Sequence, residues 1–89
     1  MRELFLETVA LTDQTGCVHR YDYSILIGEM DLGSYACESY GVKVSEQGGG
    51  QACVPNITCS ASRIDELSGL LVRNGVTPAA LNDVLSDWL

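Results

Sequence analysis

The spacing of apolar residues changes about two-thirds of the way along this chain, and this change limits the folds that it can adopt. Between residues 17 and 27 one set of side chains takes every second position, and Arg20, Asp22 and Ser24 lie between them. That alternation is typical of a strand with one buried face and one face in water. From residue 62 onward the apolar residues recur every three or four positions, which predicts amphipathic helices. The alternating set is Cys17, His19, Tyr21, Tyr23, Ile25 and Ile27.

Strands followed by helices predict an α+β fold. We expect an antiparallel four-stranded meander, because short connections favour pairing between neighbouring strands. A C-terminal αα-hairpin is expected to pack on one face of this sheet. With 89 residues, the chain is expected to form a single domain over residues 1–89. The expected strands cover residues 3–11, 17–27, 34–45 and 51–59, and the expected helices cover residues 63–74 and 78–88.

Turn residues support these boundaries. The segment 13–16 reads Asp-Gln-Thr-Gly and predicts a hairpin turn, and the three glycines at 48–50 predict a second hairpin tip. Pro55 falls within the last expected strand. Because proline cannot donate to a sheet ladder, we expect this strand to lie at an edge or to be bulged there.

Capping signals set the expected ends of the helices. Ser62, with Asp65 three residues later, is typical of the start of a helix. Gly75 is a natural left-handed stop for that helix. Thr77 and Pro78 then predict a new helix, with a capping hydroxyl followed by a proline at the first helical position.

The charge of the chain argues against several functions. There are 12 acidic and five basic residues, for a formal net charge of −7, whereas binding to phosphates requires clustered Lys and Arg. The two helices do not suit a DNA-binding helix-turn-helix either, because the only charges of the second one are Asp83 and Asp87. An anionic membrane surface is disfavoured for the same reason. No apolar run is long enough to span a bilayer and no signal-peptide core is visible, so we expect a cytoplasmic protein.

The four cysteines are even in number, but their spacing fits no common site. There is no CxxC pair for zinc, and cytosolic thiols usually stay reduced. Cys53 and Cys59 share one strand face at a separation too long for a disulfide. We therefore expect all four to be small, partly buried hydrophobic side chains, with a redox or metal role as the alternative. The four are Cys17, Cys37, Cys53 and Cys59.

Catalytic motifs are absent from the sequence. There is no nucleophile elbow, phosphate-binding glycine loop or zinc-protease motif, so we expect no enzyme activity, no cofactor and no metal. The single histidine, His19, is expected on the partly buried face of its strand, as a structural residue rather than a catalytic base. Glu29, Asp31 and Glu38 lack the regular oxygen spacing of a calcium loop and are expected to be solvated loop charges.

Several segments resemble a family of short, uncharacterised proteins of gut Firmicutes, described as a domain of unknown function. The resemblance lies in the run YDYSILIGEMDLGSYACESYGV at residues 21–42 and in VPNIT, SRIDEL and VTP further on. These stretches together cover most of the chain. The resemblance implies a free-standing bacterial cytosolic protein. It does not imply any catalytic residue, cofactor or partner.

The leading hypothesis is a small, non-enzymatic protein-interaction or regulatory module. Its motivation is the absence of catalytic motifs, the acidic surface and the potential exposed edge at the strand that contains Pro55. Its thin core favours burial of further apolar surface against a protein partner or in a homodimer. The alternative is an acidic inhibitor that imitates nucleic acid, although the acids are spread along the chain as simple solubility also requires. A small-ligand site between sheet and helices is a third hypothesis. The candidate interface residues are Tyr21, Tyr23, Tyr35, Tyr40 and Trp88, with packing beneath the helices as the more ordinary role of the tyrosines.

Overall fold

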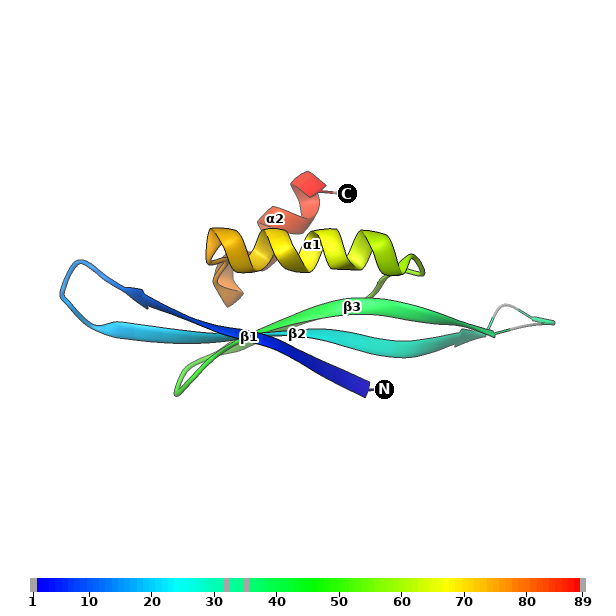
Figure 1. The fold of residues 1–89 in the computed structure, drawn as a ribbon, viewed down its shortest axis with the longest axis horizontal. Helices are drawn as coiled ribbons and strands as arrows, with labels where there is room; N and C mark the ends of the chain where they lie inside the picture. The colour runs from blue at the N-terminus through cyan, green and yellow to red at the C-terminus, as the bar shows by residue number, and fades with distance from the viewer. Residues whose placement is uncertain (1, 32, 35, 89) are drawn as a thin grey trace.

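A computed structural model describes residues 2–31, 33–34 and 36–88. It confirms the predicted α+β class: a four-stranded antiparallel meander in the order β1-β2-β3-β4, followed by two C-terminal helices (Figure 1). A short 3₁₀ segment, η1, precedes the second helix. The elements are β1 (Arg2–Thr12), β2 (Val18–Asp31), β3 (Ala36–Glu46), β4 (Gln51–Thr58), α1 (Ala61–Asn74), η1 (Pro78–Ala80) and α2 (Leu81–Trp88).

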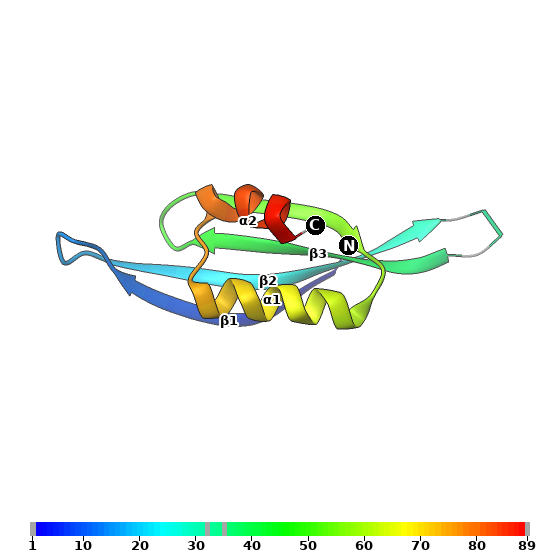
Figure 2. The ribbon, with the colours of Figure 1, turned by 90° about the horizontal axis from the view of Figure 1, so that it is seen from above.

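Both helices lie on the same side of the sheet (Figure 1). Seen from above, α1 lies over the half of the sheet that contains β1 and β2, and α2 lies over the other half (Figure 2). The predicted buried face of β2 forms the centre of the core, with Tyr21, Tyr23 and Ile25 packed in one cluster with residues of α1. Alternation along β2 therefore placed the aromatic residues correctly beneath the helices. The α1 side chains of this core are Ile64, Leu67 and Leu71.

The last strand is both at an edge and bulged, as Pro55 predicted. β4 pairs only with β3 among the described residues, and the register shifts between Tyr40 and Val42 of β3. Asn56 adopts a left-handed φ of 56° next to this proline. At the bulge the β4 backbone comes so close to Gly41 that a Cβ there would lie within 3 Å of main-chain atoms. Glycine at this position is therefore required by the close approach of two strands.

The first helix begins earlier than its predicted cap. Its N-cap is Ser60 and not Ser62, since Ser60 has extended backbone and its hydroxyl oxygen accepts a hydrogen bond of 3.3 Å from the backbone N–H of Arg63. The reason is that β4 ends at Thr58, so the chain turns into the helix sooner than residue 62. The end of the helix agrees with the prediction, because Gly75 is the left-handed C-cap with φ of 57°.

The second helical segment begins at Pro78 as a 3₁₀ turn and becomes α-helical at Leu81. Pro78 occupies the predicted first position. The prediction that the Thr77 hydroxyl caps this segment is wrong, since the Thr77 side chain makes no capping hydrogen bond. The 3₁₀ turn instead closes through a hydrogen bond of 3.1 Å from the N–H of Ala80 to the carbonyl of Thr77.

The other face of the sheet carries no helix in Figure 1. Leu26 points to this face and is nevertheless buried. An ion pair of 3.0 Å joins Glu3 of β1 to Lys43 of β3, so these side chains extend across β2 on that face. The long aliphatic part of a lysine can cover an apolar neighbour in this way while its charge stays in water.

Candidate functional site

The candidate interface aromatics lie mainly within the fold. Tyr21 and Tyr23 are buried under the helices, and Tyr40 and Trp88 are partly buried against the same core. The guanidinium carbon of Arg63 lies over the Trp88 ring, 4.5 Å from the ring centroid, and so covers one face of the ring. Tyr35 lies outside the described residues. An interface role for this group stays a prediction.

The cysteines are more exposed than their sequence context predicts. Cys17, Cys53 and Cys59 are exposed and only Cys37 is partly buried, so the expectation of four partly buried residues is wrong for three of them. The physical reason is position: Cys17 lies in the first hairpin turn, Cys53 lies on an edge strand, and Cys59 follows the end of that strand. Cys37 and Cys59 meet, with their sulfur atoms 3.4 Å apart. No group of three or more potential metal ligands occurs among the residues that the structure describes.

His19 is held between two carboxylates. Its Nε2 lies 2.7 Å from Asp13 Oδ2, its Nδ1 lies 2.7 Å from Glu46 Oε1, and its ring stacks on Tyr21. Hydrogen bonds that His19 donates to Asp13 and Glu46 raise the pKa of His19 above its usual value. Thr15, His19 and Cys17 lower the pKa of Asp13 by donating hydrogen bonds to its carboxylate. An imidazole with both nitrogens donating to carboxylates has no free lone pair, so it is poorly suited to act as a general base. No local pattern pointed to Glu46, which reaches His19 from the far end of β3.

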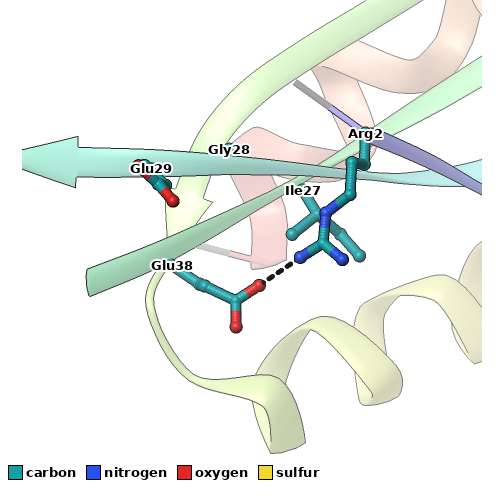
Figure 3. A pocket seen from close by; sticks show the side chains of 5 residues that line it. All are labelled: Arg2, Ile27, Gly28, Glu29 and Glu38. Carbon is teal, nitrogen blue, oxygen red and sulfur yellow. Dashed lines mark hydrogen bonds and ion pairs between the residues drawn. The ribbon is translucent and has the colours of Figure 1, made fainter. Parts of the chain in front are cut away.

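A pocket of about 350 Å³ lies near the N-terminus of β1 (Figure 3). The guanidinium of Arg2 reaches across its mouth to Glu38 of β3, at 2.8 Å. Glu29 also lines it, directly opposite Glu38 in the β2–β3 register. Glu29, Asp31 and Glu38 thus lie on strands and not in a loop as expected, although all three are exposed to water. Arg2 offsets the mutual repulsion of Glu29 and Glu38. Both partners of the Arg2–Glu38 ion pair are exposed to water, so we expect this pocket to bind a ligand only weakly.

The most unusual surface is the outer edge of β1. Among the described residues β1 pairs with β2 alone, and ten of its 11 residues are exposed. Leu4 and Phe5 are 51% and 58% exposed. The register shifts between Phe5 and Glu7, so a bulge turns both Leu6 and Glu7 toward α1. Pro55 marked the β4 edge in the sequence, but no comparable residue marked this one, because the first strand reads as an ordinary β-prone segment.

A groove separates this edge from helix α1. It has a volume of about 350 Å³ and is lined by Leu6 and Glu7 of β1 and by one flank of α1. Along that flank the small residue Gly69 lies midway between Asp65 and Arg73. We call the outer edge of β1 together with this flank the β1–α1 surface. Its α1 residues are Asp65, Ser68, Gly69, Val72 and Arg73.

The fold and this surface define a two-layer α+β protein whose sheet leaves one apolar edge open beside a helix. The chain belongs to DUF6514, a family of unknown function whose model matches residues 2–89. No curated protein and no solved structure matches it. In the described part of the chain, neither helix has the length and apolar character needed to cross a membrane.

Proposed function

We propose that this chain is a small, non-enzymatic protein-interaction module, that it binds through the β1–α1 surface, and that its partner there is a second copy of the same chain. The observation that carries the proposal is the open apolar edge of β1. A cytoplasmic location also belongs to the proposal, and four free thiols are in keeping with a reducing compartment.

The two edges of the sheet differ in a way that favours strand addition at β1. An edge strand presents unpaired N–H and C=O groups, and proteins commonly protect such edges with proline, lysine or a bulge. β4 is protected by Pro55 and a bulge. β1 also has a bulge, but its sequence RELFLETVALT contains neither proline nor lysine and presents Leu4, Phe5 and Leu6 to water. A second strand added to β1 would cover both the polar backbone and these side chains.

The charges on α1 fit a two-fold arrangement of two copies. α1 runs in the same direction as β1 (Figure 2), so antiparallel pairing of two β1 strands also places two α1 helices antiparallel. If the two-fold axis passes near Gly69, Asp65 of each copy approaches Arg73 of the other, because both residues lie four positions from that glycine. The Cβ position of Gly69 is open apart from Arg73 Nη1 at 3.8 Å, which leaves room for a close helix approach. Self-complementarity of this kind is what a two-fold interface requires.

The charges of β1 are compatible with the same axis. Leu6 and Gly69 line one groove, so an axis near Gly69 also passes near Leu6. With the axis between Leu6 and Glu7, Arg2 lies opposite Leu11, Glu3 opposite Ala10, and Phe5 opposite Thr8 of the other strand. The two residues of each of these pairs share a sheet face, and no like charges oppose one another. The net charge of −7 on each copy opposes association, but physiological salt screens exposed charges beyond roughly 8 Å.

The proposal is tested by measuring the self-association of the purified chain by sedimentation equilibrium over a wide range of concentrations. We expect a reversible dimer. Asp65→Arg places a second guanidinium against Arg73 of the other copy and should weaken the dimer at least about tenfold. The double variant Asp65→Arg/Arg73→Asp should restore it. Asp87→Arg on α2 makes the same change in net charge away from the surface and should leave the dissociation constant within about twofold.

Amide hydrogen exchange supplies the second readout. On dimerisation the β1 amides that face outward should exchange more slowly, while those of β4 should not change. A chain that stays monomeric at all concentrations contradicts self-association. A dimer without β1 protection, or without rescue by the double variant, contradicts the β1–α1 surface.

The nucleic-acid-mimic alternative has less support. Glu3 and Glu38 are paired with Lys43 and Arg2, and Asp13 and Glu46 both contact the ring of His19 at 2.7 Å. Carboxylates that are already paired are less available to imitate a run of phosphates. If the immobilised chain captures a nucleic-acid-binding protein, and high salt then releases that protein, the result would favour the mimic instead.

A further inference from the structure

We propose that Cys37 and Cys59 form a redox-modification site, which low-molecular-weight disulfides convert to an intramolecular disulfide. The observation that carries this proposal is the sulfur–sulfur distance of 3.4 Å. The site lies on the β3–β4 side of the sheet, whereas the β1–α1 surface lies at the other edge, so the two proposals are independent.

The strand register explains why two cysteines 22 residues apart meet. Tyr40 of β3 pairs with Thr58 of β4, so the next residue, Cys59, lies diagonally across from Cys37. Both cysteines lie near the ends of their strands: Cys37 is the second residue of β3, and Cys59 follows the last residue of β4. A disulfide has an S–S bond of about 2.05 Å, so the sulfurs must approach by a little over ~1 Å. Side-chain rotation and the chain after Thr58 can supply such a movement.

The reaction is thiol–disulfide exchange in two steps. The exposed Cys59, as its thiolate, attacks one sulfur of a small disulfide RSSR, which forms a mixed disulfide and releases one thiolate. Cys37, as its thiolate, then attacks Sγ of Cys59, forms the Cys37–Cys59 bond and releases the second thiolate. The two protein thiols are oxidised, RSSR is reduced to two RSH, and the two protons lost by the cysteines pass to the released thiolates.

The environment assigns the two roles. Cys59 is exposed and can meet a reagent in solution, while Cys37 is partly buried beside it. Contact with Cys59 raises the pKa of the Cys37 thiol, which disfavours Cys37 as the first attacking thiolate. Cys17 and Cys53 are also exposed and serve as internal controls, since neither shares a sulfur contact of this kind within the described residues.

The disulfide would link the start of β3 to the residue before Ser60, the N-cap of α1. It therefore closes a loop that contains the β3–β4 hairpin from Cys37 onward. Closing such a loop restricts the unfolded chain more than the folded one, so the oxidised protein should unfold at a higher temperature than the reduced protein, by on the order of 10 °C.

The experiment equilibrates the full chain with mixtures of reduced and oxidised glutathione, alkylates the remaining thiols, and maps the peptides by mass spectrometry without reduction. We expect a Cys37–Cys59 cross-link with Cys17 and Cys53 alkylated, and reversal by excess reduced glutathione. The double variant Cys17→Ser/Cys53→Ser should form the cross-link at the same glutathione ratio. Cys37→Ser should retain glutathione on Cys59 at oxidising glutathione ratios, because no neighbouring protein thiol is left to displace it.

Two results would overturn the proposal. One is equal glutathione modification of all four cysteines without the cross-link in the wild-type chain. The other is a cross-link that involves Cys17 or Cys53 as often as Cys37 and Cys59. The rise in unfolding temperature on oxidation should also be absent in Cys37→Ser, and an equal rise in that variant would contradict the assignment of the stabilising bond.

Discussion

The hydroxyl of Tyr23 donates a hydrogen bond of 2.9 Å to the backbone carbonyl of Val76. Tyr23 is only 1% exposed at the centre of β2, and Val76 is buried in the connection between α1 and η1. Burial also raises the pKa of Tyr23, so the hydroxyl stays a donor at all ordinary pH values. This bond ties the helical layer to the sheet at the point where the chain turns between helices.

Tyr23→Phe should therefore lower the free energy of unfolding. The ring and its packing remain, but a buried carbonyl loses its partner, which costs about 1 to 3 kcal/mol. Urea unfolding followed by circular dichroism measures the change. Tyr21→Phe, on the same face of β2, removes a hydroxyl for which the described residues show no such bond, and it should have a smaller effect. An equal loss in both variants would contradict a specific role of the Val76 bond.

Gly41→Ala should be strongly destabilising. Its Cβ would meet the carbonyl oxygen of Val54 and Cα of Pro55, which are backbone atoms of the β4 bulge and cannot rotate away. Overpacking of this kind should lower the free energy of unfolding by about 2 kcal/mol or more. Gly50→Ala is the matched control, because nothing lies within 4 Å of its Cβ position. Comparable stability of the two alanine variants would show that the close approach at Gly41 is absent.

The N-cap of α1 can be located by a pair of substitutions. Ser60→Ala removes the hydroxyl that accepts from the Arg63 N–H and should lower the free energy of unfolding by about 1 kcal/mol. Ser62→Ala, within the first turn of the same helix, should be close to neutral or slightly stabilising, since alanine favours helix. The reverse order of effects in thermal or urea unfolding would place the cap at Ser62.

The His19 cluster predicts how stability changes with pH. The pKa of His19 is raised in the folded chain, so its contribution is complete below its unfolded pKa of about 6.5 and is lost as pH rises through the folded pKa. The pKa of Asp13 is lowered, so its contribution is present above its unfolded pKa of about 3.9 and is lost as pH falls toward the folded pKa.

His19→Gln should therefore remove part of the decline in unfolding free energy on the alkaline side of about pH 6.5. Asp13→Asn should do the same on the acid side of about pH 4 and should also lower the pKa of His19. Urea unfolding across this pH range measures the first effect, and the chemical shifts of the imidazole protons measure the second. A His19 pKa that stays unchanged in Asp13→Asn would contradict the hydrogen bond between them.

The helix and strand types were predictable from local patterns. Alternation over residues 17–27 placed Tyr21, Tyr23 and Ile25 on one buried face, and three- to four-residue spacing predicted both helices. The meander order also agreed with the prediction, because each connection is too short to pass over another strand. The start of α1 was missed by two residues, since two serines within three positions offer similar caps and only the end of β4 selects between them.

The candidate sites were much less predictable. The bulge that turns Leu6 and Glu7 of β1 toward α1, the contact between Cys37 and Cys59, and the link from Glu46 to His19 each depend on strand register. A register shift of one residue reverses the face of every side chain in a strand, and bulges at β1 and β4 introduce such shifts. No local signal in the sequence encodes where those shifts fall relative to distant residues.

By itself, the sequence determined the kinds of elements, their order and the apolar face that β2 and the two helices bury. These properties follow from residue spacing and turn chemistry within a few positions. Only the tertiary structure decided that β1 remains an open apolar edge beside Asp65 and Arg73 of α1, and that two thiols 22 residues apart come into contact. The physical reason is that pairing register and helix placement result from many long-range contacts acting together, whereas the sequence pattern reports each segment separately.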